Sequence, residues 1–242
     1  MFTSTKMAVL GGDEFRDEYS LAFDGTNDYI NFGNVLNLGT GDFSISAWVK
    51  ASDFNGTYIV SKYEDANNRW YLRIDSSDTP RFQFYSKVSG SATNAYFGLS
   101  NINLDTLQNQ WVHFVLSCDR DGNNVGYINT TLDDSDSSDN TDLDNTGNLH
   151  IARYDSSYSA TSISEVAFYN KALSSNEVNT IYNGREPFNH KNSAFSGNLT
   201  AWWRMGDGLE NASGTTIYDM SSNSNNGTMT NMDAVDFEGD TP

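Results

Sequence analysis

Two short segments carry side chains with the chemistry of sugar recognition. Arg69, Tyr71 and Arg73 are spaced two residues apart in the first, and Gln83 and Tyr85 share a face of the second. Aromatic rings stack against the C–H faces of sugars, while guanidinium and amide groups bind hydroxyls. The set predicts a shallow glycan-binding face on two neighbouring strands. The alternative is that these residues form ordinary cross-strand pairs on a solvated face.

The spacing of acidic residues in the predicted strands does not produce a pair of catalytic carboxylates. A retaining glycosidase needs two carboxyl groups about 5–5.5 Å apart, and residues i and i+2 or i+4 share one face of a strand. The segment 163–169 contains only Glu165, and the segment 69–75 contains only Asp75. The three histidines have no serine or cysteine partner in a recognisable nucleophile motif. We therefore expect no enzymatic activity.

Charge and cysteine content exclude several further classes. The 242 residues include 14 Lys+Arg and 32 Asp+Glu, which gives a formal net charge of −18. Nucleic-acid and anionic-membrane binding both need clustered basic residues, so we expect neither partner. No apolar run reaches the roughly 18 residues of a membrane span. The single cysteine, Cys118, cannot form an intrachain disulfide. Residues 1–20 lack a signal-peptide pattern, so we expect a chain that stays in the cell or leaves with a larger particle.

The elements that must position these residues are strands. Apolar and polar residues alternate in the segments 29–32, 42–50, 69–75, 81–86, 111–117, 125–129, 149–154 and 163–169. Since turn residues separate these short segments, the sequence predicts an all-β fold with two antiparallel sheets packed as a sandwich. Between the sheets we expect Phe43, Ile45, Val49, Leu72, Ile74, Phe82, Phe84, Phe114 and Leu116.

Three segments differ from this pattern. Ser174 and Glu177 form a capping box that starts one short helix, with Gly184 as its stop. Residues 119–123 resemble a calcium loop, but they lie between two alternating segments and predict a hairpin turn. The acidic stretch 133–148 predicts a solvated loop, with a calcium-collecting loop as the alternative.

Five segments occur in a characteristic order. They are Leu21–Ile30 (LAFDGTNDYI), Phe43–Lys50 (FSISAWVK), Trp111–Leu116 (WVHFVL), Tyr127–Asn129 (YIN) and Ile163–Ser174 (ISEVAFYNKALS). Together they resemble the laminin-G-like (LamG) jelly-roll domains of the concanavalin A-like lectin/glucanase superfamily. Thr130, Ser164 and Ala167 depart from the family pattern. The resemblance implies a jelly roll over residues 21–185, preceded by an extension of residues 1–20.

The C-terminal segment, residues 186–242, departs from the family's order. Its stretches 199–208 (LTAWWRMGDG) and 217–229 (IYDMSSNSNNGTM) resemble the segment that normally opens such a domain. We expect it to pack on the same sandwich where the family's first strand would lie, and a truncated second repeat is the alternative. Trp202 and Trp203 alternate faces, so we expect one in the core and the other as an anchor for a protein partner.

LamG relatives often hold a structural calcium ion where their opening and closing segments meet, and the resemblance implies one here. Calcium binds six to eight oxygen ligands. The matching positions are Asp24, Asp28, Glu165, Asp219, Asn223 and Asn226. For the loop 219–226 the alternative is a turn in which these side chains bond their own backbone.

The C-terminal arrangement also resembles LamG-containing structural proteins of tailed phages. It implies a non-catalytic structural or adhesive protein on the virion surface, present as an oligomer or in many copies. Its expected partners are other virion proteins and cell-surface glycans. The alternative is a calcium-dependent, carbohydrate-binding lectin module that acts outside a cell. A glycanase is a third reading, which the lack of paired carboxylates disfavours.

Overall fold

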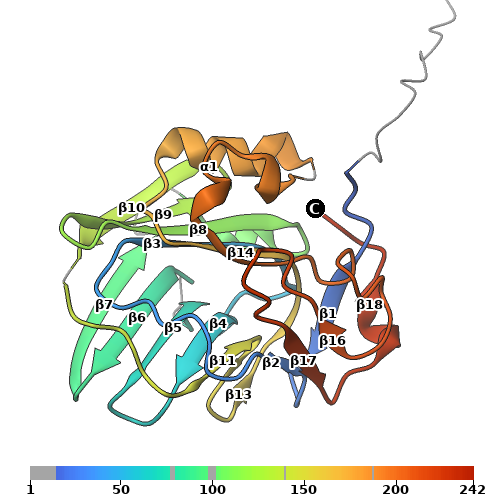
Figure 1. Cartoon of the computed structure of the whole chain (residues 1–242), viewed down its shortest axis with the longest axis horizontal. Helices are drawn as coiled ribbons and strands as arrows, with labels where there is room; N and C mark the ends of the chain where they lie inside the picture. Colours follow the sequence, from blue (N-terminus) through green and yellow to red (C-terminus); the bar gives the residue numbers. More distant parts are fainter. Residues whose placement is uncertain (1–14, 77–79, 98–101, 139, 187) are drawn as a thin grey trace, which may run out of the picture.

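Two antiparallel sheets of eight strands each pack face to face (Figure 1). This arrangement comes from a computed structural model that describes residues 15–76, 80–97, 102–138, 140–186 and 188–242. The predicted two-sheet sandwich is confirmed. Among the described residues, no helix has the length and apolar character needed to cross a membrane.

The first sheet, called sheet A, has the order β10-β9-β8-β3-β14-β1-β18, and β15 also pairs with β14. Its strands are β1 (Ser20–Asp24), β3 (Phe43–Lys50), β8 (Val112–Cys118), β9 (Asn123–Ile128), β10 (Thr131–Ser137), β14 (Ala160–Tyr169), β15 (Leu199–Trp203) and β18 (Phe237–Glu238). The turn between β8 and β9 is the hairpin predicted at 119–123, closed by a bond from the Gly122 amide to the Asp119 carbonyl at 3.1 Å.

The second sheet, called sheet B, has the order β16-β17-β2-β11-β4-β5-β6-β7. Its strands are β2 (Tyr29–Asn31), β4 (Tyr58–Tyr63), β5 (Arg69–Ile74), β6 (Phe82–Val88), β7 (Ser91–Phe97), β11 (Asn148–Ile151), β16 (Thr216–Ile217) and β17 (Gly227–Thr230). A small hairpin of β12 (Arg153–Tyr154) and β13 (Ser157–Tyr158) follows β11 along the chain.

The helical elements are short. The α-helix is α1 (Ser175–Tyr182), and the 3-10 turns are η1 (Leu104–Leu107), η2 (Asn183–Arg185), η3 (His190–Asn192), η4 (Ser196–Asn198) and η5 (Ala234–Asp236). The predicted capping box of Ser174 and Glu177 is present. The helix ends where Asn183 takes a left-handed conformation, one residue before Gly184. In Figure 1, α1 and the turns after it cover the outer face of sheet A.

The core between the sheets matches the period-two pattern. All nine predicted core residues are buried there, together with Trp70 and Trp203. A second cluster lies on the other face of sheet A, beneath α1, and contains Trp202. Trp202 is 2% exposed and Trp203 is fully buried. The expectation of an exposed tryptophan anchor is therefore wrong, because Phe15, Phe188 and His190 pack over the outer face of sheet A.

The sequence predicted a solvated loop for the acidic stretch 133–148, but the first part of this stretch forms a strand. Residues up to Ser137 belong to β10, which pairs with β9 through a bulge between Leu132 and Asp134. Backbone pairing with β9 outweighs the low strand propensity of Asp and Ser. An edge strand also tolerates charged side chains that would disfavour a central one.

The C-terminal segment contributes strands to both sheets. β15 pairs with the second half of β14, and β1 pairs with its first half. β17 pairs with β2, and β18 pairs with β1. The two strands at the start of the described chain therefore each lie beside a strand from its end.

Candidate functional site

A row of directly opposed residues crosses five strands on the outer face of sheet B. Asn31 of β2 lies opposite His150 of β11, and His150 lies opposite Ser61 of β4. The row continues through Tyr71 of β5 to Tyr85 of β6. Successive residues of a strand point to opposite faces, so this row lies on the face opposite the core.

The β12–β13 hairpin lies over the middle of this row. The Ser61 hydroxyl donates to the Arg153 carbonyl at 2.6 Å. The Tyr154 ring stacks on Tyr58 at 5.0 Å and meets Tyr71 edge-on at 4.8 Å. The hairpin thereby divides the outer face into an aromatic cluster on β5 and β6 and a hollow over β2, β11 and the end of β4.

The aromatic cluster contains the five residues predicted to bind sugars. The Tyr71 and Tyr85 rings stack at 4.8 Å with 9° between their planes. Arg73 Nε donates to Gln83 Oε1 at 2.6 Å, and the Arg73 guanidinium lies 5.2 Å from the Tyr71 ring centre. The Arg69 guanidinium lies over Tyr85 at 5.6 Å.

These internal contacts limit what the cluster can bind. Tyr71 is only 8% exposed and Gln83 only 1%, so neither presents a ring face or an amide to a ligand. The geometry is that of cross-strand pairs, the alternative raised from the sequence. Sugar binding by this set stays a prediction.

The hollow on the other side of the hairpin, called the Tyr63 hollow, has a volume of about 600 Å³. Asn31, Asn148 and His150 form its floor on β2 and β11. Tyr63 and Glu64 line one side, and the hairpin residues Arg153 and Asp155 line another. The hollow thus combines an aromatic ring with amide, carboxylate and guanidinium groups, as sugar sites do.

His150 is the most enclosed polar side chain of the hollow. It is 8% exposed, its ring meets Tyr29 edge-on at 5.3 Å, and no described residue bonds its buried Nδ1. Burial, and secondarily the charge of Arg153, lowers the pKa of His150 to about 4. The ring is therefore neutral at pH 7 and adds no charge to the hollow.

Spacing alone does not reveal this site. Its residues come from the segments 29–31, 63–64, 146–150 and 153–155, which are far apart along the chain. The available signal was the alternation that places Tyr29 with Asn31, and Asn148 with His150, on one face of each strand.

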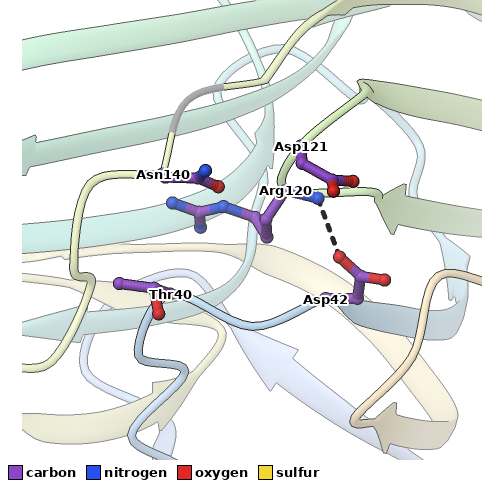
Figure 2. Close-up of a pocket in the computed structure, with 5 residues that line it drawn as sticks. All are labelled: Thr40, Asp42, Arg120, Asp121 and Asn140. Carbon is purple, nitrogen blue, oxygen red and sulfur yellow. Dashed lines mark hydrogen bonds between the residues drawn. The ribbon is translucent and has the colours of Figure 1, made fainter.

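A second hollow, called the Arg120 hollow, lies among loops at one end of the sandwich (Figure 2). Thr40, Asp42, Arg120, Asp121 and Asn140 line a volume of about 420 Å³. The Arg120 amide donates to Asp42 Oδ1 at 2.9 Å, and its guanidinium donates to the Thr141 carbonyl at 2.6 Å. None of the five lining residues is aromatic, so this hollow lacks the ring that sugar stacking requires.

The six residues predicted to hold calcium do not form one site. Asp24 Oδ1 accepts from the Thr26 amide at 2.7 Å, and Asp28 Oδ2 accepts from the Asp24 amide at 3.1 Å. Both carboxylates therefore serve the turn after β1. Among the residues that the structure describes, no three His, Cys, Asp or Glu side chains are grouped so that they could hold a metal ion.

The loop 219–226 satisfies its own backbone. Asp219 accepts from the amides of Trp202 at 3.0 Å and Asn225 at 2.9 Å. Asn226 Oδ1 accepts from the Asp219 amide at 2.9 Å, and Asn223 donates to the Thr200 carbonyl at 2.9 Å. These bonds match the alternative of a hydrogen-bonded turn, and the donor set does not fit calcium as it is arranged.

Glu165, the sixth residue, lies in a bulge of β14 between its two halves. Its carboxylate pairs with Arg204 Nε at 2.9 Å and accepts from the Trp202 indole. Burial raises the pKa of Glu165 to about 7, against the opposing effect of Arg204. Its position under Trp202 makes it a packing residue rather than a ligand for solvent ions.

We expect calcium removal to leave stability unchanged. Because the carboxylates of Asp24, Asp28 and Asp219 already accept protein hydrogen bonds, excess EDTA should not shift the melting temperature by more than about 1 °C. Thermal unfolding with EDTA, and again with added calcium, measures this. A calcium-dependent rise would show that the folded state binds the ion and that these loops rearrange around it.

Comparison with known proteins identifies the family. Residues 24–179 match the Laminin_G_3 family, described as the concanavalin A-like lectin/glucanases superfamily. Botulinum neurotoxin type E from Clostridium butyricum is 26% identical over 185 residues, which cover 70% of this chain and 14% of the toxin. The chain therefore spans only a small part of that curated relative.

Two solved structures show the same fold. One is a proposed carbohydrate-binding protein from Bacteroides ovatus, with a TM-score of 0.67, 18% identity, and 92% of this chain and 60% of that one covered. The other is a heptameric SAP-like pentraxin from Limulus polyphemus, with a TM-score of 0.54, 16% identity and coverages of 71% and 84%. With the family match extending over more than half of its residues, the chain belongs to the concanavalin A-like lectin/glucanase superfamily.

Proposed function

We propose that this protein is a non-catalytic carbohydrate-binding domain whose sugar site is the Tyr63 hollow. The observation that carries the proposal is the lining of that hollow, in which Tyr63 stands beside Asn148, Glu64 and Asp155. A half-buried ring offers stacking to a sugar, and the amide and carboxylate oxygens accept hydroxyl protons.

Membership of a superfamily of lectins and glucanases agrees with sugar binding, as does the likeness to the Bacteroides ovatus protein. Likeness of fold alone does not assign a ligand. For this reason the proposal is placed on a hollow of this chain, and it is tested there.

The acidic residues of the hollow support a non-catalytic function. A general acid needs a carboxyl group whose pKa is raised by shelter from water. Glu64 and Asp155 both lie exposed to solvent rather than sheltered from it. Glu165 is sheltered, but it is paired with Arg204 beneath a tryptophan and does not line the hollow.

We expect Tyr63→Ala to weaken sugar binding about tenfold, since it removes the stacking ring. Isothermal titration against a panel of gluco-, galacto- and manno-oligosaccharides identifies a binding sugar and measures this loss. Tyr182→Ala removes a tyrosine ring from the sheet A side, where it stacks on Trp48 at 5.5 Å, and should leave the affinity unchanged.

A second variant, Tyr85→Ala, tests which half of the outer face of sheet B binds the sugar. Tyr85 lies in the aromatic cluster outside the hollow. The affinity of the Tyr85→Ala variant for the sugar should therefore stay within about twofold of that of the parent protein, a difference near RT ln 2. A larger loss with Tyr85→Ala than with Tyr63→Ala would move the site to the cluster predicted from the sequence. Release of reducing sugar from any member of the panel would contradict the non-catalytic assignment.

We further propose that the protein is located on the surface of a virion. It is supported by the resemblance of the C-terminal segment to tailed-phage structural proteins and by the charge of −18, which would keep many copies on one particle from aggregating. Other virion proteins would be its partners, and a secreted lectin is the alternative. Mass spectrometry of purified particles tests it, and absence of the protein from every particle would reject it.

A further inference from the structure

We infer that the Tyr63 hollow takes uncharged sugars and discriminates against acidic ones, such as sialylated, sulfated or uronic acid glycans. The inference rests on the proposed function and adds the chemical class of the ligand. The observation behind it concerns Arg153, which is the only arginine or lysine among the described residues that line the hollow. Its guanidinium contacts residues of its own hairpin.

Arg153 is held from three directions. Its guanidinium lies over the Tyr29 ring at 4.4 Å and the Tyr158 ring at 5.6 Å. Its Nε donates to the Asp155 carbonyl at 2.7 Å, and its own carbonyl accepts from Ser61. A side-on bidentate grip on a carboxylate or sulfate uses Nε together with one terminal nitrogen of the guanidinium, and here Nε already donates to the Asp155 carbonyl.

The other charges around the hollow are negative. Glu64 and Asp155 supply two carboxylates against one guanidinium, and His150 is neutral because burial lowers its pKa to about 4. Lys62 lies nearby in the sequence, but it is fully buried and donates to Asn34, Val35 and Asn37. The hollow is therefore negative as a whole, within a chain whose net charge is −18.

These groups suit sugar hydroxyls better than anions. Carboxylates only accept hydrogen bonds when ionised, so Glu64 and Asp155 favour ligands that present O–H donors. A sugar carboxylate or sulfate in the same place would face two like charges at short range, which disfavours binding. A neutral ring stacked on Tyr63 meets no such penalty.

The test compares each neutral sugar with an acidic form of the same sugar. Each neutral oligosaccharide that binds in the panel is paired with the same sugar carrying sialic acid, a sulfate or a uronic carboxylate. At low salt we expect the acidic member to bind about three- to tenfold more weakly, and we expect the gap to narrow at 0.5 M salt because screening shortens the range of the repulsion.

The double variant Glu64→Gln/Asp155→Asn tests whether these two carboxylates cause the weaker binding of acidic sugars. It should narrow the gap between the paired sugars, while Asp136→Asn/Glu186→Gln, which changes the net charge equally on the sheet A side, should not. Equal or tighter binding of the acidic sugars overturns the inference while leaving sugar binding at this hollow intact. The inference is also overturned if both double variants reduce the difference in affinity between neutral and acidic sugars equally. In that case the net charge of the whole chain, and not the carboxylates of the hollow, would cause the difference. Binding of neither class refutes the proposed function itself.

Discussion

A chain that ends at Gly184 will not form the native sandwich. The missing residues include β15, β16, β17 and β18, which pair with strands of both sheets. The shortened chain also lacks buried side chains of the core between the sheets and of the cluster beneath α1, namely Trp202, Trp203, Met205, Ile217 and Met229. Loss of a single buried tryptophan costs about 3–5 kcal/mol, and a whole domain has a stability of only about 5–15 kcal/mol. The expected result is a chain without a cooperative melting transition.

Near-ultraviolet circular dichroism and thermal unfolding measure this outcome. The control is the shortened chain mixed with a peptide of residues 186–242, which should recover part of the native signal because it supplies the missing strands. A shortened chain that melts cooperatively within a few degrees of the full chain would show that the C-terminal segment is an appendage.

Arg204→Met will destabilise the protein strongly above neutral pH and weakly below pH 5. Arg204 pairs with Glu165 at 2.9 Å, donates to the Asp207 carbonyl at 2.9 Å and to the Arg16 carbonyl, and lies over the Phe15 ring at 4.2 Å. Removing one partner of a buried ion pair leaves an uncompensated charge, which costs about 3–5 kcal/mol.

The direction of the pH dependence follows from the pKa of Glu165. Burial raises this pKa to about 7 in the folded protein, from about 4.5 in an unfolded chain. Stability from this group is therefore complete below pH 4.5 and is lost as the pH rises through about 7. Without Arg204 the folded-state pKa rises further, so the cost grows with pH. Burial, and then Glu165 and Asp207, also raise the pKa of Asp17 to about 10, and Arg204 opposes that shift. Loss of Arg204 therefore acts on Asp17 in the same direction as on Glu165.

Urea denaturation at pH 5 and pH 8.5 measures the difference. The double variant Glu165→Gln/Arg204→Met should recover much of the loss at pH 8.5, because it removes the buried charge with its partner. An equal loss for Arg204→Met at both pH values would contradict the assignment and would make lost packing against Phe15 the main cause.

The sequence by itself determined the class of fold and its core. Alternation places Phe43, Ile45 and Val49 on one face of β3, and all three are buried between the sheets. The helix and the β8–β9 hairpin were also predictable, because a capping box and an Asp-Gly turn act within a few residues. Each of these features depends on local geometry that the chain carries with it.

Tertiary structure decided which surfaces stay open. The period-two pattern places Tyr71 and Tyr85 on the outer face, but only the folded chain places Tyr154 of the hairpin against Tyr71. In the same way it buries Trp202 against His190, and it turns Glu165 into the partner of Arg204 through a bulge. A strand's pattern fixes the face on which a side chain lies, whereas the elements that cover that face come from distant parts of the chain. Register and packing between those parts created the Tyr63 hollow, and neither is encoded in any one segment.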